Sequence, residues 1–385
     1  MKNFLNLVAA LLLAFSVGCN HDNDDAQYID QDGNTVITTH SGCSGGHCHS
    51  ATTVTPAPAQ VPAIIQVPAP APSQDAPPVT ITVTDPSPAP AVQLPAAAGV
   101  KRAVIVGVNK FTDPGAPTLT GCVPDAARIY AKCTGGGADK FAGKVDPALI
   151  AKCAVNPWGF DPKNIILLLD EDATVANVKA ALIATVAASK PGDEFLYWSS
   201  SHGTEDTIPD DNGAVVHGMI VMHDFDWSRE KEICDVDLRA IFAKLPAGVI
   251  FNHASDSCNS GTLDRNVGKH KHPVHDKALV QPPNVRIRVH AARINGAKTK
   301  GLINDELDVG YLPGCRLDQT SADSQDDDGY PGGALTIMAM KNFDAFADKP
   351  LTDLAKQIDQ DLAANGYDQV SIPTGARKNK PWLKN

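Results

Sequence analysis

The chain has 385 residues, a length that allows more than one domain, and its 44 acidic and 33 basic residues give a formal net charge of −11. The sequence contains no basic stripe of the kind that binds phosphate backbones, so the composition excludes a typical nucleic-acid-binding protein. The moderate acidity fits a soluble surface or a site that attracts cations.

The first residues have the pattern of an export signal. Lys2 is followed by an apolar run that is too short to span a bilayer as a mature helix, and then by small residues. Cys19 follows as in a bacterial lipobox, where the cysteine is lipidated, although Ser16 stands where that pattern prefers an aliphatic residue. Residues 1–18 are therefore expected to be a lipoprotein-type signal peptide, with a cleaved secretory signal and an uncleaved anchor as the alternatives. The expected location is the outer membrane or periplasm through a lipid anchor, or otherwise secretion.

The next segment, residues 19–99, is rich in proline and alanine. Proline at this density favours extended polyproline II conformation, so the segment is expected to be a disordered linker between the anchor and a folded domain at 100–385.

From residue 100 the sequence alternates between short apolar runs and amphipathic segments. In chain order these predict a strand at 102–108, a helix at 124–133, a strand at 164–169, a helix between Thr174 and Lys190, a strand at 194–200, a loop at 218–223, a helix at 235–245, strands at 248–254 and 285–291, and helices at 333–343 and 351–366. This order predicts an α/β fold with a mostly parallel central sheet and helices on both faces.

A histidine and a cysteine, which can act as a base and a nucleophile, directly follow two of these strands. His202 comes directly after the strand at 194–200, and Cys258 comes directly after the strand at 248–254. Because ligands bind beyond the carboxyl ends of parallel strands, the pair is expected at one sheet edge as a nucleophile and its base. The N–H groups of Gly203 and Cys258 are the expected donors to an oxyanion, and Asp256 is an expected contact for a cationic side chain.

The segments "FLYWSSSHGTED" and "FNHASDSCNSGT" resemble the two signature segments of the caspase-like cysteine peptidases (peptidase C14), specifically the metacaspase and bacterial orthocaspase branch. The resemblance continues through "RAVIVGVNKF", "LTGCVPDAARIY" and "GCRLDQTSAD". It implies a caspase-like three-layer sandwich, and it departs from the family at Ser201 and Asn259, where Gly and His are common.

Carried over residue by residue, the resemblance implies that His202 is the catalytic histidine and Cys258 the nucleophile. It implies a pocket for a basic side chain formed by Cys122, Asp125, Ser200 and Asp256. The implied activity is a hydrolase that cleaves proteins or peptides after Arg or Lys.

The resemblance also raises the question of an activating Ca²⁺, since many metacaspases bind one through acidic residues. The candidate ligands in this sequence are Asp210, Asp211, Asp235 and Asp237, although His217 and Cys234 occupy places where an acid is expected. A solvated acidic loop is the alternative reading, and no cofactor is expected to be required.

Two further alternatives follow from the sequence. The chain is either an active endopeptidase or a catalytically silent, lipid-tethered module that binds partners, for instance if Cys258 is oxidised with Cys122 or Cys315. The basic loop at 263–277 is either a self-processing site or a solvated loop. The sequence leaves the oligomeric state open.

Overall fold

The computed structural model describes residues 26–29, 35–44, 47–55, 99–210, 213–258, 272–295, 297, 299–300, 302–303 and 307–383. The chain divides into two compact units, Met1–Pro88 and Ala89–Asn385. The signal peptide at 1–18 and Cys19 lie outside the described residues.

The first unit contains an antiparallel sheet of β1 (Ala26–Ile29), β2 (Thr35–Ser44) and β3 (His47–Thr55). These strands lie inside residues 19–99, the segment expected to be a linker, and the domain boundaries given above stay a prediction. β2 and β3 are rich in threonine and valine, which favour extended backbone. The proline-rich residues 56–98 lie outside the described residues.

The second unit is organised by a parallel sheet of five strands. These are β4 (Lys101–Gly107), β5 (Ile165–Leu169), β6 (Glu194–Ser200), β10 (Ile250–Asp256) and β13 (Gly310–Pro313). They pair in the order β13-β10-β6-β4-β5, and every pairing is parallel. The central strand β6 is buried along its whole length, as the apolar run at residues 195–198 predicts for a strand covered on both faces.

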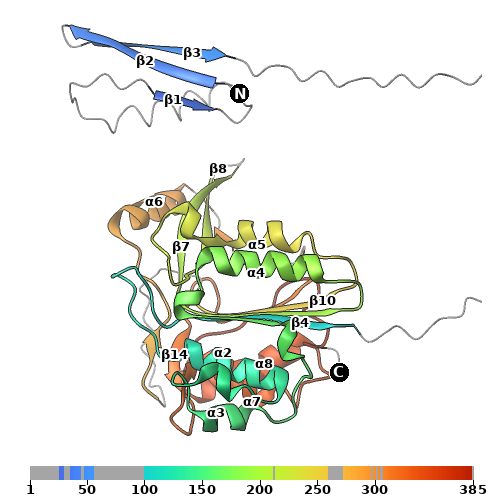
Figure 1. Cartoon of the computed structure of the whole chain (residues 1–385). Coiled ribbons are helices and arrows are strands. Elements are labelled where there is room, and N and C mark those ends of the chain that lie inside the picture. The colour runs from blue at the N-terminus through green and yellow to red at the C-terminus, as the bar shows by residue number, and fades with distance from the viewer. Residues whose placement is uncertain are drawn as a thin grey trace, which may run out of the picture. The chain divides into compact units, whose positions relative to one another are not determined.

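Helices cover both faces of this sheet (Figure 1). One layer holds α4 (Val175–Ala188) and α5 (Asp235–Phe242); the other holds α2 (Cys122–Thr134), α3 (Pro147–Cys153), α7 (Ala334–Asn342) and α8 (Leu351–Ala364). Successive residues of β6 serve opposite layers, with Tyr197 in the core that includes α4 and Trp198 in the core that includes α2 and α7. The predicted α/β fold is confirmed.

The helix boundaries follow their local signals. The Thr174 side chain accepts a hydrogen bond from the Asn177 N–H, as expected for the cap of α4. Helix α2 begins two residues earlier than predicted because the Asn109 side chain accepts hydrogen bonds from the N–H groups of Cys122 and Val123. Short 3-10 helices connect the larger elements at η1 (Ala138–Phe141), η2 (Pro162–Asn164), η3 (Asp170–Asp172) and η4 (Arg229–Lys231).

The predicted strand at 285–291 is wrong, because this segment is helix α6 (Pro283–Ile294). Its alternating polar and apolar residues mimic a strand, but the residues that it buries are Val285, Val289 and Ala292, at helical spacing. Prolines at 282 and 283 begin the helix, since proline suits the first turn. The predicted loop at 218–223 is also partly wrong, because residues 218–220 complete β8 (Gly213–Ile220).

Two small sheets beyond the carboxyl ends of the main strands were not predicted. One pairs β7 (Gly203–Asp210) with β8, and β8 with β9 (Ile233–Cys234) and β12 (Thr299–Lys300). The other pairs β14 (Ala322–Gln325) with β11 (His275–Asp276) and β15 (Pro331–Gly333). Both sheets contribute to the site described below.

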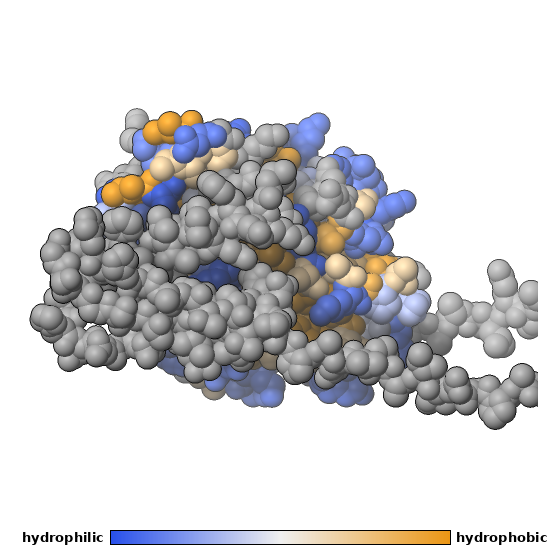
Figure 2. All heavy atoms as spheres, turned by 90° about the horizontal axis from the view of Figure 1, so that it is seen from above, coloured by the Kyte–Doolittle hydropathy of each residue, from blue (hydrophilic) through white to orange (hydrophobic). Residues whose placement is uncertain are grey.

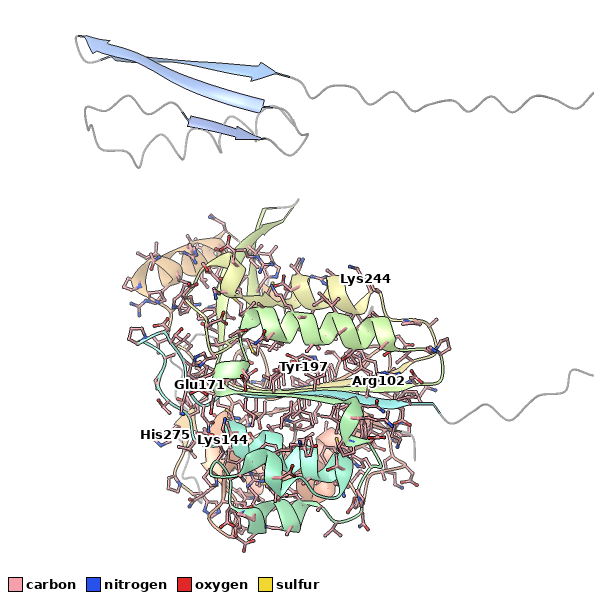
Figure 3. The ribbon with its side chains drawn as sticks, viewed as in Figure 1. Arg102, Lys144, Glu171, Tyr197, Lys244 and His275 are labelled. Carbon is pink, nitrogen blue, oxygen red and sulfur yellow. The ribbon has the colours of Figure 1, made fainter. Side chains whose placement is uncertain are left out.

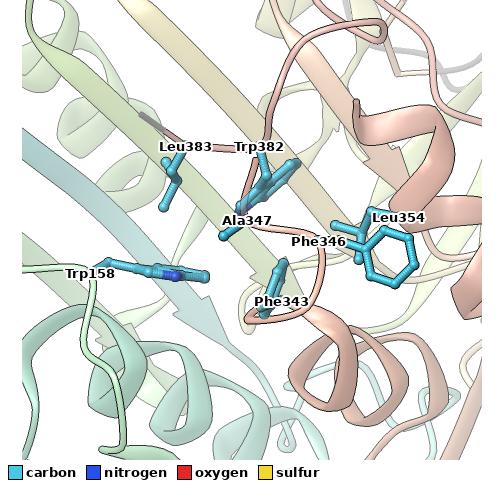
Figure 4. Close-up of a pocket in the computed structure, with 7 residues that line it drawn as sticks. All are labelled: Trp158, Phe343, Phe346, Ala347, Leu354, Trp382 and Leu383. Atoms are coloured by element: carbon cyan, nitrogen blue, oxygen red, sulfur yellow. The ribbon is translucent and has the colours of Figure 1, made fainter. Parts of the chain in front are cut away.

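The surface seen from above the α4 side is mostly hydrophilic with separate apolar patches (Figure 2). In the part of the chain that the structure describes, no helix has the length and apolar character to cross a membrane. An apolar pocket between Trp158, Phe343 and Trp382 (Figure 4) lies near the starts of the main strands, because the Trp158 carbonyl accepts a hydrogen bond from Lys101, the first residue of β4.

Candidate active site

The candidate site lies at the carboxyl ends of β6 and β10. The two strands pair in register, with Ser200 opposite Asp256, so His202 and Cys258 each follow two residues beyond a matched pair. In Figure 3 this end of the sheet is marked by Glu171, just after β5, and by His275, whereas Arg102 near the start of β4 lies at the opposite end. The structure therefore brings the two predicted residues to one edge.

Gly203 is packed directly against the backbone of Cys258. A Cβ atom at position 203 would lie 1.4 Å from the Cys258 carbonyl oxygen, a distance that no side chain tolerates. Glycine is thus needed here for close approach of two backbones. This contact joins the residue after His202 to Cys258 itself.

The His202 side chain is buried, and one of its two ring nitrogens forms a hydrogen bond. Its Nε2 lies 2.7 Å from the Pro117 carbonyl oxygen, and its ring centroid is 4.9 Å from that of Phe111. Because a carbonyl only accepts hydrogen bonds, Nε2 carries the proton and Nδ1 presents its lone pair. Nδ1 is buried without a hydrogen-bond partner. Burial lowers the pKa of His202, so the ring is neutral and Nδ1 is free to take a proton.

Cys258 is fully buried as a thiol. Its Sγ accepts a hydrogen bond of 2.9 Å from the Ser321 N–H. Burial and the neighbouring Cys315 raise the pKa of Cys258 well above its ordinary value, against the opposing effect of the Ser321 N–H. Cys122 and Cys315 are also free thiols, so the three cysteines are unpaired in this structure.

The four predicted pocket residues are brought together beside the pair. Ser200 Oγ donates a 2.8 Å hydrogen bond to Asp125 Oδ2, which joins the end of β6 to the first turn of α2. Asp256 Oδ2 accepts hydrogen bonds from the Thr336 N–H (2.9 Å) and hydroxyl (2.7 Å). Cys122 is buried at the start of α2, and burial raises its pKa. Both carboxylates are fully buried, an arrangement that requires a cation between them.

That cation is Lys277, a residue of the same chain. Its Nζ lies 3.1 Å from Asp256 Oδ1 and 3.3 Å from Asp125 Oδ2, and it donates a 2.9 Å hydrogen bond to Ser200 Oγ. The side chain is completely buried. Burial alone would lower the pKa of Lys277, but the surrounding carboxylates raise it well above its ordinary value, so the group is an ammonium.

The backbone of Lys277 also contacts the site. The Gly203 N–H, predicted to face an oxyanion, donates a 2.8 Å hydrogen bond to the Lys277 carbonyl oxygen. The Lys277 N–H donates a 2.9 Å hydrogen bond to the Ser321 carbonyl oxygen. Lys277 thus fills both the acidic pocket and the place next to the predicted oxyanion donor.

Sequence reasoning missed several residues that complete this site. Pro117 orients the histidine, Ser321 contacts both Sγ and Lys277, and Thr336 holds Asp256. Pro117 and Ser321 lie outside helices and strands, and Thr336 lies in the first turn of α7, so none of the three had a distinctive sequence pattern. Lys277 alone had a signal, as the last basic residue of the loop at 263–277.

The described residues do not fit the expected calcium site. Asp235 accepts hydrogen bonds from His217 and Arg239, and Asp237 forms ion pairs with Arg229 (3.0 Å) and Lys179 (3.1 Å). Both carboxylates are therefore neutralised by the protein itself. Asp211 and the side chain of Asp210 lie outside the described residues. Among those described, no three acidic, histidine or cysteine side chains form a metal-binding group.

A family model and several proteins that are similar to this chain in sequence all carry the name metacaspase. Residues 142–265 match the family model described as metacaspase, peptidase C14 domain. The chain is 25% identical to "Metacaspase-1" of Scheffersomyces stipitis over 71% of this chain and 70% of that protein. It is 32% identical to "Metacaspase-4" of Arabidopsis thaliana over 42% of this chain, and it spans only 34% of that protein's length.

Two solved structures also align with the chain. Protein GSU0716 from Geobacter sulfurreducens aligns with a TM-score of 0.47 and 21% identity, over 74% of this chain and 98% of that one. Caspase-1 from Spodoptera frugiperda aligns with a TM-score of 0.42 and 13% identity, over 72% of this chain and 87% of that one. Residues 142–265 thus match the metacaspase, peptidase C14 domain model, and the chain is similar in sequence to proteins named metacaspases.

Proposed function

We propose that this protein is a cysteine endopeptidase that cleaves peptide bonds after Lys or Arg. The observation that carries the proposal is Lys277, whose ammonium group lies between Asp125 and Asp256 while its carbonyl oxygen accepts a hydrogen bond from Gly203. A substrate residue would need the same two contacts, one for its charge and one for its carbonyl. Charge-assisted hydrogen bonds to two carboxylates favour a basic side chain and reject an acidic one.

The proposed reaction uses His202 Nδ1 as the proton carrier. The Cys258 thiol gives its proton to Nδ1, and Sγ attacks the carbonyl carbon. The N–H groups of Gly203 and Cys258 stabilise the negative oxygen of the tetrahedral intermediate. His202 then passes the proton to the leaving amine, the C–N bond breaks, and water hydrolyses the thioester.

A panel of fluorogenic peptides tests this proposal on the full chain. The peptides differ only in the residue before the cleaved bond, which is Lys, Arg, citrulline or Asp. We expect turnover with Lys and Arg, and at least about 10²-fold less with the neutral arginine analogue citrulline, because two buried carboxylates lose their counter-charge. Preference for Asp would contradict the assigned pocket. Absence of turnover with every peptide, in reductant and with or without calcium, would favour a catalytically silent binding module.

The proposal predicts that activity rises with pH. Burial raises the pKa of Asp125 to about 7 against the opposing charge of Lys277, and burial raises the pKa of Cys258 above its ordinary value. Both groups act in their negative forms, the carboxylate to bind a cation and the thiolate to attack. We therefore expect kcat/KM for an Arg peptide to fall as pH drops below 7 and to keep rising above it. A profile from pH 5 to 9 that is flat, or highest at pH 5, would contradict this.

We also propose that the chain is exported and lipid-anchored at Cys19, which rests on the sequence of residues 1–19 alone. Metabolic labelling with a radioactive fatty acid, with Cys19→Ala as the control, tests this; an unlabelled parent chain would exclude the anchor.

A further inference from the structure

The carbonyl oxygen that orients His202 belongs to a loop that packing alone does not fix. Pro117 supplies this oxygen, yet Pro117, Thr118 and Thr120 are all exposed. Within residues 117–120, Leu119 alone is buried. The position of the Pro117 carbonyl therefore depends on hydrogen bonds that the loop forms with other parts of the fold.

The carboxylate of Asp323, in β14, supplies three of these hydrogen bonds. Its Oδ2 accepts from the Thr120 N–H (2.8 Å) and from the Thr120 hydroxyl (3.1 Å), and its Oδ1 accepts from the Gly121 N–H (2.9 Å). The approach is close, because a Cβ atom at position 121 would lie 2.2 Å from Asp323 Oδ1. Glycine at 121 thus lets the carboxylate reach the backbone of the loop that carries Pro117.

Asp323 is a buried charge, and its exposed fraction is 1%. Burying a carboxylate is costly unless its oxygens accept hydrogen bonds, and here all three donors are neutral. An asparagine has a single acceptor oxygen, so it cannot accept from the Thr120 and Gly121 N–H groups with one oxygen each. The carboxylate is therefore suited to fixing two successive N–H groups of this loop.

The position of Asp323 in the chain links the loop to the nucleophile. Ser321, two residues before Asp323, donates its N–H to Cys258 Sγ. His202 Nδ1 has no hydrogen-bond partner among the described residues, so no direct bond to Cys258 fixes the distance between the two side chains. Residues 321–323 contact the thiol at one end and the loop that orients the imidazole at the other.

The charge of Asp323 also acts on His202. Burial lowers the pKa of His202, and the Lys277 ammonium lowers it further. The hydrogen bond to the Pro117 carbonyl and the negative charge of Asp323 oppose this lowering. When the ring takes a proton from the thiol, Asp323 therefore stabilises the positive form.

We propose that Asp323 is a positioning residue for His202: its carboxylate fixes residues 117–121, and the Pro117 carbonyl then holds the imidazole in the orientation that proton transfer with Cys258 needs. This inference rests on the proposed peptidase activity. Asp323 acts through the loop and does not touch the substrate. A misplaced ring slows the proton-transfer steps, whereas the binding of a basic side chain is left unchanged.

The experiment measures the steady-state kinetics of Asp323→Asn in the full chain with the Arg and citrulline peptides. We expect kcat for the Arg peptide to fall by roughly 10–10²-fold, which is part of the contribution of a proton-transfer residue, while KM changes by less than about threefold. Because the loss arises at His202, kcat/KM should fall by the same factor for both peptides. Asp359→Asn, which removes a half-buried carboxylate that accepts the Ser371 N–H, is the matched control and should change neither parameter by more than about twofold.

A double variant tests whether Asp323 acts through His202. When His202→Ala is already present, there is no imidazole left to position. Adding Asp323→Asn should then reduce the residual turnover by less than about threefold. If the two losses multiply in the double variant, Asp323 acts on another part of the site and the inference is wrong.

Thr120→Ala provides a second measurement if Asp323→Asn does not fold. Thr120 is exposed, and the change removes only the hydroxyl that donates to Asp323 Oδ2. We expect kcat to fall by roughly threefold to tenfold with KM unchanged. Thr118→Ala, at an exposed threonine of the same loop, is its control and should keep the kcat of the parent chain. A Thr120→Ala variant as active as Thr118→Ala would contradict the inference.

The outcomes separate this inference from the activity on which it rests. Absence of turnover in the parent chain would overturn the proposed function and the inference with it. An active parent chain together with an Asp323→Asn variant that keeps kcat within about threefold would overturn the inference alone. A loss confined to the Arg peptide would place the effect of Asp323 in the acidic pocket, and would also overturn the inference while leaving the peptidase activity intact.

Discussion

Replacing the nucleophilic sulfur by oxygen, in Cys258→Ser, is expected to reduce kcat for a Lys peptide by at least about 10³-fold. A serine hydroxyl is a far weaker acid than a thiol, and burial lowers the pKa of His202, so His202 removes the hydroxyl proton much less readily than the thiol proton. His202→Ala is expected to cost roughly 10²–10⁴-fold, since the leaving amine then lacks a proton donor. The measurement is steady-state turnover on the full chain, with thermal unfolding to verify that each variant is folded.

Matched controls isolate the chemistry from packing. Cys153→Ala removes another buried thiol, in α3, and His223→Ala removes a histidine whose ring contacts the Lys110 carbonyl. Both should keep turnover within about threefold of the parent chain, because neither contacts the site. Equal turnover by Cys258→Ser and the parent chain would exclude the dyad. Equal losses in the variants and the controls would indicate a folding defect instead.

The central sheet could be predicted from sequence because its strands are buried on both faces and therefore carry unbroken apolar runs, as in β4 and β6. The same strands also allowed us to predict that His202 and Cys258 lie at one edge of the sheet, because the carboxyl ends of parallel strands lie at the same edge. Helix α6 was misread because Val285, Ile287 and Val289 alternate with polar residues, yet Ile287 is 68% exposed. A short segment of alternating apolar and polar residues is compatible with both the strand period of 2 and the helix period of 3.6. The surface against which the segment packs determines which of the two structures forms.

The occupant of the pocket could not be predicted in the same way. Lys277 reaches Asp125 and Asp256 only because β11 pairs with β14, which follows it by more than forty residues. A two-residue strand leaves no periodic signal, and its partner is fixed by long-range pairing. The sequence therefore did not identify Lys277 as the residue that lies between Asp125 and Asp256. The same holds for Pro117, whose role depends on a carbonyl oxygen that every residue has.

The largest effect on specificity is expected from neutralising the pocket with Asp256→Asn. The asparagine can keep the two hydrogen bonds from Thr336 through its carbonyl oxygen and turn its NH₂ towards the Ser321 hydroxyl, which can reverse to accept. The amide then faces the resident Lys277 ammonium as well as an incoming cation, so thermal unfolding has to verify that the variant folds. Removing one partner of a buried ion pair costs about 3–5 kcal/mol, or roughly 10²–10⁴-fold.

The test compares Arg and citrulline peptides in the same variant. Because citrulline has the shape of arginine without its charge, we expect Asp256→Asn to reduce kcat/KM for Arg by roughly 10²–10⁴-fold and for citrulline by less than about threefold. Asp318→Asn, which removes an exposed carboxylate paired with Arg316, is the matched control. It should leave kcat/KM unchanged for both the Arg and the citrulline peptide. An equal loss for the two peptides would mean that Asp256 supports the site's structure and does not select charge.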